Sequence, residues 1–181
     1  MKKLLKAVTI LTITVQLMSC TTTGTTLTFD DEKTNEIRAH FEDYKNANLD
    51  GMLTRWSDDL KVLTNDGTVG LSDVEEIILL HHTLFSEIYF TSPHSDDDPF
   101  YAETNTYPDG KTWTKTWYKW HATGNYTGKK VTNLGMIGFR WEDGKIVEEN
   151  HFGDNAALNA EALERGNAAV EWQKSLEALE E

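Results

Sequence analysis

Cysteine and basic side chains are scarce in this chain of 181 residues. It holds one cysteine, Cys20, which excludes an internal disulfide framework and any cysteine-rich metal site. Seventeen Lys and Arg stand against thirty Asp and Glu, a formal net charge of −13. Such a surface repels nucleic acid and anionic headgroups, so we expect no nucleic-acid partner. Three prolines, twelve glycines and 39% hydrophobic residues argue against disorder and fibrous repeats, and favour one folded core.

The N-terminal segment has a basic start followed by a mostly apolar run over Ala7–Met18. This run is too short for a permanent membrane helix, which needs about 20 residues. It ends in Leu17-Met18-Ser19-Cys20, an arrangement that resembles a bacterial lipoprotein signal. The resemblance implies cleavage before Cys20, acylation of that residue and a lipid anchor in the membrane. The alternative is an ordinary signal peptide with a chance cysteine. Thr21 in place of an aspartate implies, by the same resemblance, sorting to the outer membrane.

Four segments follow from this interpretation. Residues 1–19 are the signal peptide, and 20–33 are the lipidated cysteine with a flexible tether, in which Thr21–Thr28 contains six threonines and one glycine. Residues 34–165 form the domain, and 166–181 form a C-terminal amphipathic helix. Removing residues 1–19 takes three lysines from the seventeen basic groups. Fourteen then remain against thirty acidic ones, so the mature net charge is −16.

The domain places helices before strands. Apolar spacing predicts helices over 34–48 and 49–56, and Ser72-Asp73-Val74-Glu75 has the form of a capping box that begins a third. Its buried stripe is expected to continue to Ile88. Segments rich in Thr, Val and aromatic residues then predict strands from 89 onward and over 61–64, 100–107, 111–122, 130–141 and 145–152, with tight turns at 108–110 and 142–144. Helical segments over 154–164 and 168–180 complete an α+β domain.

Two stretches carry a family resemblance. Asn48-Leu49-Asp50-Gly51-Met52-Leu53, with Trp56-Ser57-Asp58-Asp59, is similar to the opening of nuclear-transport-factor-2-like domains, in particular the SnoaL-like group. The end of the domain, Phe139-Arg140-Trp141-Glu142-Asp143-Gly144-Lys145-Ile146-Val147-Glu148-Glu149, resembles the same family. The resemblance covers roughly residues 34 to 164. It implies a cone-shaped, curved antiparallel sheet packed against N-terminal helices, with a pocket at the open end.

The family contains ketosteroid isomerases, polyketide cyclases, dehydratases and many proteins without a known reaction, so the fold alone does not define the function. The isomerases need a carboxylate base on the first strand and a tyrosine on the first helix. The resemblance aligns Thr64 and His40 with those positions, so isomerase chemistry by that machinery is not expected. The cyclases place acid–base residues on later strands, where His121, His151 and Glu148 are the catalytic candidates.

Alternation along the strand divides these candidates. Glu148 and Asn150 share one face, and Glu149 and His151 share the other. A histidine close to an acid can act as a general base near neutral pH. The alternative is a polar rim on a cavity that binds a ligand without chemistry.

Ligand-binding candidates are aromatic or polar residues of the same strands and the third helix: Trp117, Tyr101, Asn150 and His81. Trp113 and Trp117 share a face and could form a stacking platform for a sugar or another flat ligand. Core packing on one face and a dimer contact on the other is the alternative, and the family resemblance implies a homodimer through the sheet face.

No cofactor and no metal site is expected. His81 and His82 are adjacent on a helix and face different directions. The acids Asp96–Asp98 lack the alternating spacing and the glycine turn of a calcium loop. Two classes of function remain: an accessory protein that binds a small molecule, and an isomerase, cyclase or dehydratase that uses His and Glu side chains.

Overall fold

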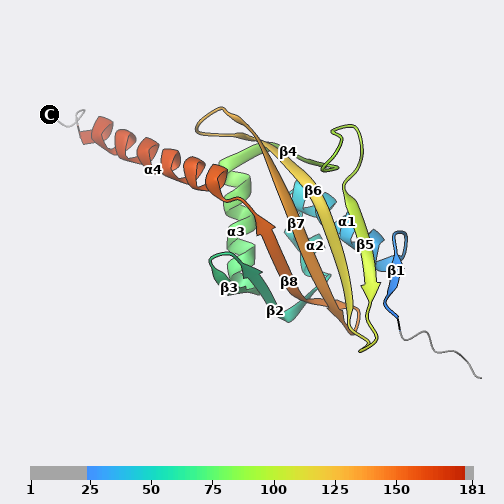
Figure 1. The fold of residues 1–181 in the computed structure, drawn as a ribbon. Coiled ribbons are helices and arrows are strands. Elements are labelled where there is room, and N and C mark those ends of the chain that lie inside the picture. The colour runs from blue at the N-terminus through green and yellow to red at the C-terminus, as the bar shows by residue number, and fades with distance from the viewer. Residues whose placement is uncertain (1–23, 178–181) are drawn as a thin grey trace, which may run out of the picture.

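The structure is a computed structural model that describes residues 24–177. The predicted signal peptide and Cys20 lie outside these residues. The described chain is built on one curved sheet with helices on its concave side, as Figure 1 shows. The predicted α+β class is confirmed.

Eight strands form the sheet in the order β1-β5-β6-β7-β8-β2-β3, and β4 also pairs with β6. Their bounds are β1 Thr26–Thr28, β2 Trp56–Thr64, β3 Gly67–Gly70, β4 Phe85–Thr91, β5 Tyr101–Thr106, β6 Thr112–Gly124, β7 Lys130–Glu142 and β8 Lys145–Gly153. The first half of β6 pairs with β5 and its second half with β4. All pairs are antiparallel except β2 with β8, which run parallel. The antiparallel strands predicted from the sequence are therefore joined to β2 and β3 through one parallel pair.

The helices are α1 Glu32–Lys45, α2 Leu49–Leu53, α3 Leu71–Leu84 and α4 Ala156–Glu177. In Figure 1, α1, α2 and α3 lie against the sheet, whereas α4 projects away from the rest of the molecule. None of these described helices combines the length and the apolar character that a membrane span requires.

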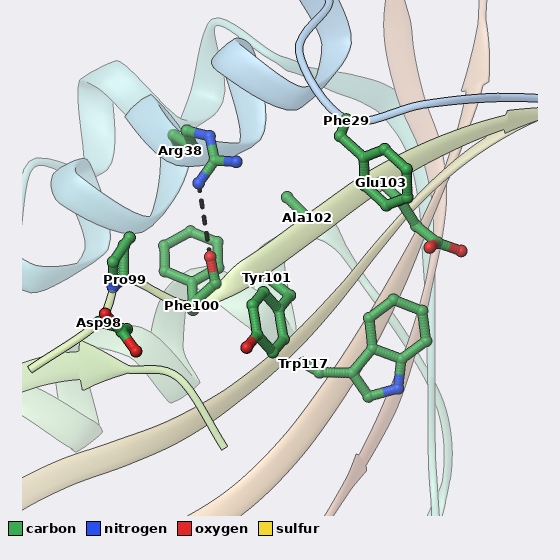
Figure 2. A pocket seen from close by; sticks show the side chains of 9 residues that line it. All are labelled: Phe29, Arg38, Asp98, Pro99, Phe100, Tyr101, Ala102, Glu103 and Trp117. Carbon is green, nitrogen blue, oxygen red and sulfur yellow. Dashed lines mark hydrogen bonds between the residues drawn. The ribbon is translucent and has the colours of Figure 1, made fainter. Parts of the chain in front are cut away.

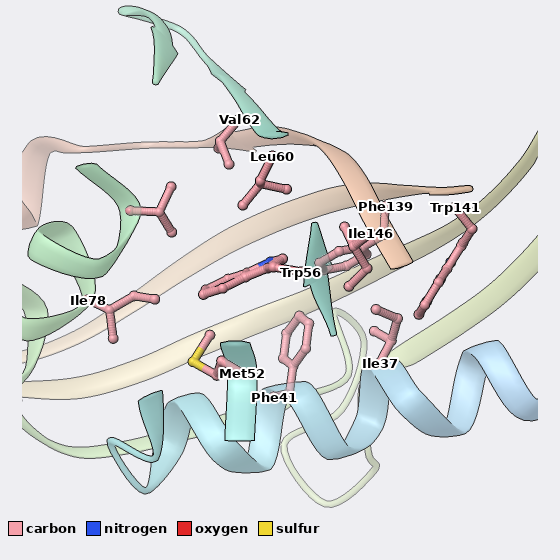
Figure 3. Close-up of a cluster of buried hydrophobic side chains, with 11 residues drawn as sticks. Ile37, Phe41, Met52, Trp56, Leu60, Val62, Ile78, Phe139, Trp141 and Ile146 are labelled. Carbon is pink, nitrogen blue, oxygen red and sulfur yellow. The ribbon is translucent and has the colours of Figure 1, made fainter. Parts of the chain in front are cut away.

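The hydrophobic core lies between the concave side of the sheet and the helices (Figure 3). Phe139 and Ile146 come from the sheet and Ile37 from α1, and none of the three is exposed. Burying a side chain of this size contributes roughly 2 kcal/mol. The core therefore fixes α1 over strands β7 and β8, which carry the candidate site.

A chain of polar groups ties the start of α1 to the sheet. The Asp31 carboxylate caps α1 by accepting the Thr34 N–H, and it also accepts the Thr104 hydroxyl at 3.0 Å. Thr104 in turn lies 3.0 Å from the Thr114 hydroxyl, which accepts the Trp141 indole N–H at 2.9 Å. Each buried polar atom of this chain thus has a partner, as buried polar groups require.

The structure corrects three boundaries predicted from the sequence. Helix α3 begins at Leu71 with Gly70 as its N-cap, and the Asp73 carboxylate accepts the Gly70 N–H at 3.0 Å, so Ser72 lies inside the helix. The helix ends at Leu84, and Ile88 belongs to β4. Part of the predicted tether, Thr26–Thr28, is strand β1 paired with β5.

The predicted break between two helices at Gly166 is also absent. Helix α4 runs without interruption from Ala156 to Glu177. Leu158 near its start packs against the core, but apolar side chains farther along do not. Leu163 is 64% exposed, Val170 54% and Trp172 67%. Only the first turns are attached to the domain. There the Glu161 carboxylate, 1% exposed, accepts the backbone N–H groups of Tyr126 and Thr127.

Candidate functional site

Alternation along β6, β7 and β8 divides their side chains between the inside of the cone and the outer face of the sheet. Tyr118 packs edge-on against Phe41 of α1 and Phe90, with ring centroids 5.3 and 5.4 Å apart, so it lies inside. Its neighbour Trp117 therefore lies outside. On β8 the fully buried Glu149 lies inside, and Glu148 lies outside.

A carboxylate and an imidazole meet inside the cone. His151 Nε2 lies 2.6 Å from Glu149 Oε2, and the Trp56 indole N–H donates to Glu149 Oε1 at 2.5 Å. Glu149 is 2% exposed, whereas the His151 side chain is 37% exposed. The carboxylate is thus enclosed and held from two sides, while its histidine partner can be reached from solvent.

This pairing fixes which His151 nitrogen can act on a ligand. In the neutral ring, Nε2 carries the proton that the Glu149 carboxylate accepts, and Nδ1 keeps its lone pair. Among the described residues His151 Nδ1 has no hydrogen-bond partner. A buried acid that orients a histidine with a free second nitrogen is the arrangement of a general base and its orienting group.

Burial alone would raise the pKa of Glu149. The hydrogen bond and charge of His151, together with the Trp56 hydrogen bond, outweigh burial, so the pKa lies below its ordinary value. Glu149 is therefore ionised at neutral pH, and its carboxylate can accept the His151 Nε2 proton.

Tyr118 adds a hydroxyl donor to the same inner face of the sheet. It faces Gly135 directly across β6 and β7, and a Cβ on Gly135 would lie 2.6 Å from the Tyr118 hydroxyl oxygen. Ile137, two residues along β7, pairs with His151. Tyr118 and His151 therefore lie on the same inner face, on β6 and β8, with β7 between them. Burial, together with the charges of Tyr44 and Glu149, raises the pKa of Tyr118, so its O–H stays protonated.

His40 borders the same interior without a polar partner. Its ring is 4% exposed and meets Trp56 edge-on at 5.0 Å, and its Nδ1 is buried without a hydrogen bond in the described structure. Burial lowers the pKa of His40 to about 4, and this ring is neutral at physiological pH. The tyrosine position implied by the family resemblance is thus occupied by a neutral imidazole. Thr64, aligned with the base, is the last residue of β2, and its hydroxyl donates to Gly67 O.

His81 and His82 of α3 both contact Tyr44 of α1. His81 Nδ1 lies 3.0 Å from the Tyr44 hydroxyl, and His82 Nε2 lies 2.7 Å from the Tyr44 carbonyl. Burial, with the charges of His82 and His151, lowers the pKa of His81 to about 4. The predicted ligand contact His81 therefore lies inside the cone, engaged with Tyr44.

The three predicted catalytic residues do not share a pocket. His151 lies inside, whereas Glu148 lies outside, where it accepts Arg140 Nε at 3.0 Å. His121 is outside too, between the hydroxyls of Thr91 and Thr132 at 2.8 and 3.1 Å. Because the sheet separates the groups, they cannot form one acid–base set.

The predicted ligand contacts are similarly divided. Trp117 and Tyr101 line one hollow of about 600 Å³ at the β5 edge of the sheet (Figure 2). Asn150 lines a smaller hollow of about 220 Å³ beside Trp113. The first hollow lies at the β5 edge, where Arg38 of α1 meets the outer face, and the second lies on the outer face; neither is lined by Glu149 or His151. We place the candidate site at that pair, because it combines an oriented base, an ionised acid and a hydroxyl donor.

Sequence reasoning missed the acid of the pair. The period of a strand puts residues 149 and 151 on one face, so the signal was present in the Glu-Asn-His spacing. No three His, Cys, Asp or Glu side chains within residues 24–177 gather closely enough to hold a metal ion.

Three solved structures show what the fold resembles. An NTF2-like protein from Burkholderia xenovorans aligns with a TM-score of 0.53 at 10% identity over 74% of this chain and 98% of its own. An NTF2-like protein of unknown function from Burkholderia pseudomallei gives 0.52 at 17% identity over 71% and 95%. AclR from Streptomyces galilaeus, a proposed hydroxylase, gives 0.52 at 17% identity over 70% and 92%.

At these identities the likeness concerns the fold alone. The chain has the NTF2-like fold, as the sequence resemblance implied. No family model and no curated protein matches the sequence. The function must therefore be argued from the side chains of the site.

Proposed function

We propose that this protein is a bacterial lipoprotein, anchored through Cys20 in the outer membrane, whose domain binds a small organic molecule against His151 inside the cone. The Glu149–His151 pair carries the proposal. A buried carboxylate held by two donors, with its histidine open to solvent, is costly to bury and typical of sites that act on a ligand.

The site favours a ligand that donates one hydrogen bond and accepts another. His151 Nδ1 offers a lone pair, and the Tyr118 O–H offers a donor. Phe41 and Phe90 contact the Tyr118 ring, and Phe139 contacts Phe41, so this end of the site suits an apolar skeleton. A flat carbonyl or phenol compound meets all three demands.

A thermal-shift screen of carbonyl and phenol fragments tests this binding. A fragment at 100 times its dissociation constant adds about 2.7 kcal/mol of stability, a rise of roughly 5–10 °C in melting temperature. The shifts should disappear in His151→Phe and persist in His121→Phe, whose ring lies on the other face of the sheet. Hits that survive in His151→Phe, or no hits at all, would place binding elsewhere or reject it.

The anchor is tested separately. Cys20→Ala should move the protein from the membrane fraction to the soluble fraction of a Gram-negative host and abolish labelling with radioactive palmitate. Thr21→Asp should keep the label and move the protein to the inner membrane. A palmitate label on Cys20→Ala would contradict acylation at this residue.

A second candidate function is proton transfer, as in an isomerase, cyclase or dehydratase. The tautomer fixed by Glu149 favours it, because His151 Nδ1 can take a proton from a carbon next to a carbonyl while the Tyr118 O–H stabilises the oxygen that gains charge. His151 would return the proton to another atom of the same molecule.

Deuterium exchange into carbonyl fragments, followed by proton NMR, measures this chemistry. Glu149→Gln should slow exchange by about 10²-fold or more, since an oriented general base contributes 10²–10⁴. Glu148→Gln is the matched control, because it changes the neighbouring acid on the outer face. Equal loss in both variants would contradict the assignment of Glu149.

A further inference from the structure

The hollow at the β5 edge is separate from the site inside the cone. It is formed where Phe29, in the loop before α1, and Arg38 of α1 meet the outer side of β5 and β6. Its volume of about 600 Å³ falls in the range of small-molecule sites, about 300–1,000 Å³. Neither the acid–base pair nor Tyr118 reaches it, so a ligand here would be independent of the proposed function.

Four aromatic rings border this hollow, as Figure 2 shows: Phe29, Phe100, Tyr101 and Trp117. Tyr101 and Trp117 are direct partners across the β5–β6 pair, and Phe29 comes from a different segment. Phe29 is 62% exposed and Tyr101 49%. In the described structure the rings of Phe29, Tyr101 and Trp117 do not pack against one another. The Tyr101 ring meets the His94 ring at a centroid distance of 6.1 Å, and Trp117 is half-buried. The remaining ring surface is open to water, although burying it is favourable.

The polar groups of the hollow carry opposite charges. The carboxylates of Asp98 and Glu103 have no hydrogen bond or ion pair within residues 24–177. The Arg38 guanidinium lies 5.7 Å from the Phe100 ring centroid and donates a single bond, to Phe100 O at 3.4 Å. Acceptors and donors therefore both remain free around the rings.

This charge distribution selects the class of ligand. A cation would be attracted by the carboxylates but would meet Arg38, and an anion would meet two carboxylates. A neutral molecule with several hydroxyl groups satisfies both, because each hydroxyl can donate to a carboxylate and accept from the guanidinium. The aromatic rings require in addition that one face of the molecule is apolar. A pyranose ring combines these properties, with C–H bonds on its face and hydroxyls around its rim.

We propose that the hollow formed by Phe29, Arg38, Asp98, Tyr101, Glu103 and Trp117 is a carbohydrate-binding site for a neutral pyranose. The sugar face lies on the Trp117 and Tyr101 rings. Its rim hydroxyls donate to Asp98 and Glu103 and accept from Arg38.

Isothermal titration calorimetry on the full-length protein tests the proposal. The protein is kept in a detergent without a sugar headgroup, and the probes are glucose, galactose, mannose and their β-1,4- and α-1,4-linked hexasaccharides. Glucuronate and glucosamine, which carry a negative and a positive charge on the same ring, are the charged comparators. We expect at least one neutral sugar to bind, and to bind more tightly than either charged comparator.

Two variants locate the binding. Trp117→Ala should weaken it about tenfold or more, the loss expected for one stacked aromatic ring. Glu103→Gln, an unpaired surface acid whose loss leaves the fold intact, should weaken it about threefold or more. Trp113→Ala is the matched control, since it lies four residues earlier on the same face and lines the other hollow.

Every other result overturns the proposal. No heat with any neutral sugar rejects the ligand class, as does tighter binding of glucuronate or glucosamine. Equal affinity of Trp117→Ala, Glu103→Gln and the unmodified protein moves the site elsewhere. Concentration-dependent dimerisation in sedimentation equilibrium that Trp117→Ala abolishes would make these rings a contact between two copies of the chain.

Discussion

Replacing His40 by phenylalanine is expected to remove a large part of the acid sensitivity of this protein. His40 is 4% exposed and its Nδ1 has no hydrogen-bond partner among the described residues, so the folded protein disfavours its protonated form. Phenylalanine keeps an aromatic ring against Trp56 and Phe139 but does not titrate.

The expected size follows from proton linkage. Burial lowers the pKa of His40 from 6.5 to about 4, so between these values the unfolded chain binds a proton that the folded protein does not. Stability is therefore lost as the pH falls from 6.5 towards 4. Between pH 7 and pH 5 the loss from this residue is about 2 kcal/mol. Burial lowers the pKa of His81 to about 4 as well, so a second loss of similar size remains in the variant.

Urea unfolding followed by tryptophan fluorescence at pH 7 and pH 5 measures the effect. For a slope of about 2 kcal/mol per M urea, the His40 loss moves the midpoint by about 1 M, and His40→Phe should recover that shift. Any packing penalty of phenylalanine is the same at both pH values and cancels in the difference. The exposed His94 is the control, and His94→Phe should retain the full acid sensitivity. An unchanged pH dependence in His40→Phe would refute the reasoning.

Three further substitutions test the support of the fold and the site. Glu161→Ala should leave the N–H groups that it accepts unpaired and free the start of α4, at a cost of about 1–3 kcal/mol, seen as faster amide exchange at Thr127. Gly135→Ala places a Cβ 2.5 Å from the Tyr118 ring, so we expect a loss of about 1–3 kcal/mol in thermal melts and weaker fragment binding. Asp31→Ala removes the cap of α1 and should cost about 1–2 kcal/mol in urea unfolding. Unaltered amide exchange, melting temperature or urea midpoint, respectively, would contradict each assignment.

Strand periodicity predicted much of the sheet because each strand carries its own alternating pattern. The same pattern showed that Glu149 and His151 share a face, yet the catalytic candidate chosen was Glu148. Which face of β8 points inward depends on where α1 packs. The residues of β8 alone do not predict that contact. Long-range packing decides between two adjacent glutamates.

The predicted helix boundaries were wrong where two local sequence signals compete. Gly70 with Asp73 and Ser72 with Glu75 both have capping spacing, and the pairing of β3 selects the first by ending that strand at Gly70. Gly166 was expected to divide α4, but one glycine costs only about 1 kcal/mol in a helix whose neighbours are strong helix formers.

The parallel pairing of β2 with β8 has a consequence for the order in which the chain can fold. The Trp56–Glu149 hydrogen bond joins residues 93 positions apart, and β2 finds its parallel neighbour only when β8 has been synthesised. Closing so long a loop is a slow step, because the entropy of closure is lost before the new contacts form. The acid–base pair can therefore assemble only in a chain that is already complete through β8. A product truncated before that strand would lack both the pair and the strand that joins β2 and β3 to the rest of the sheet.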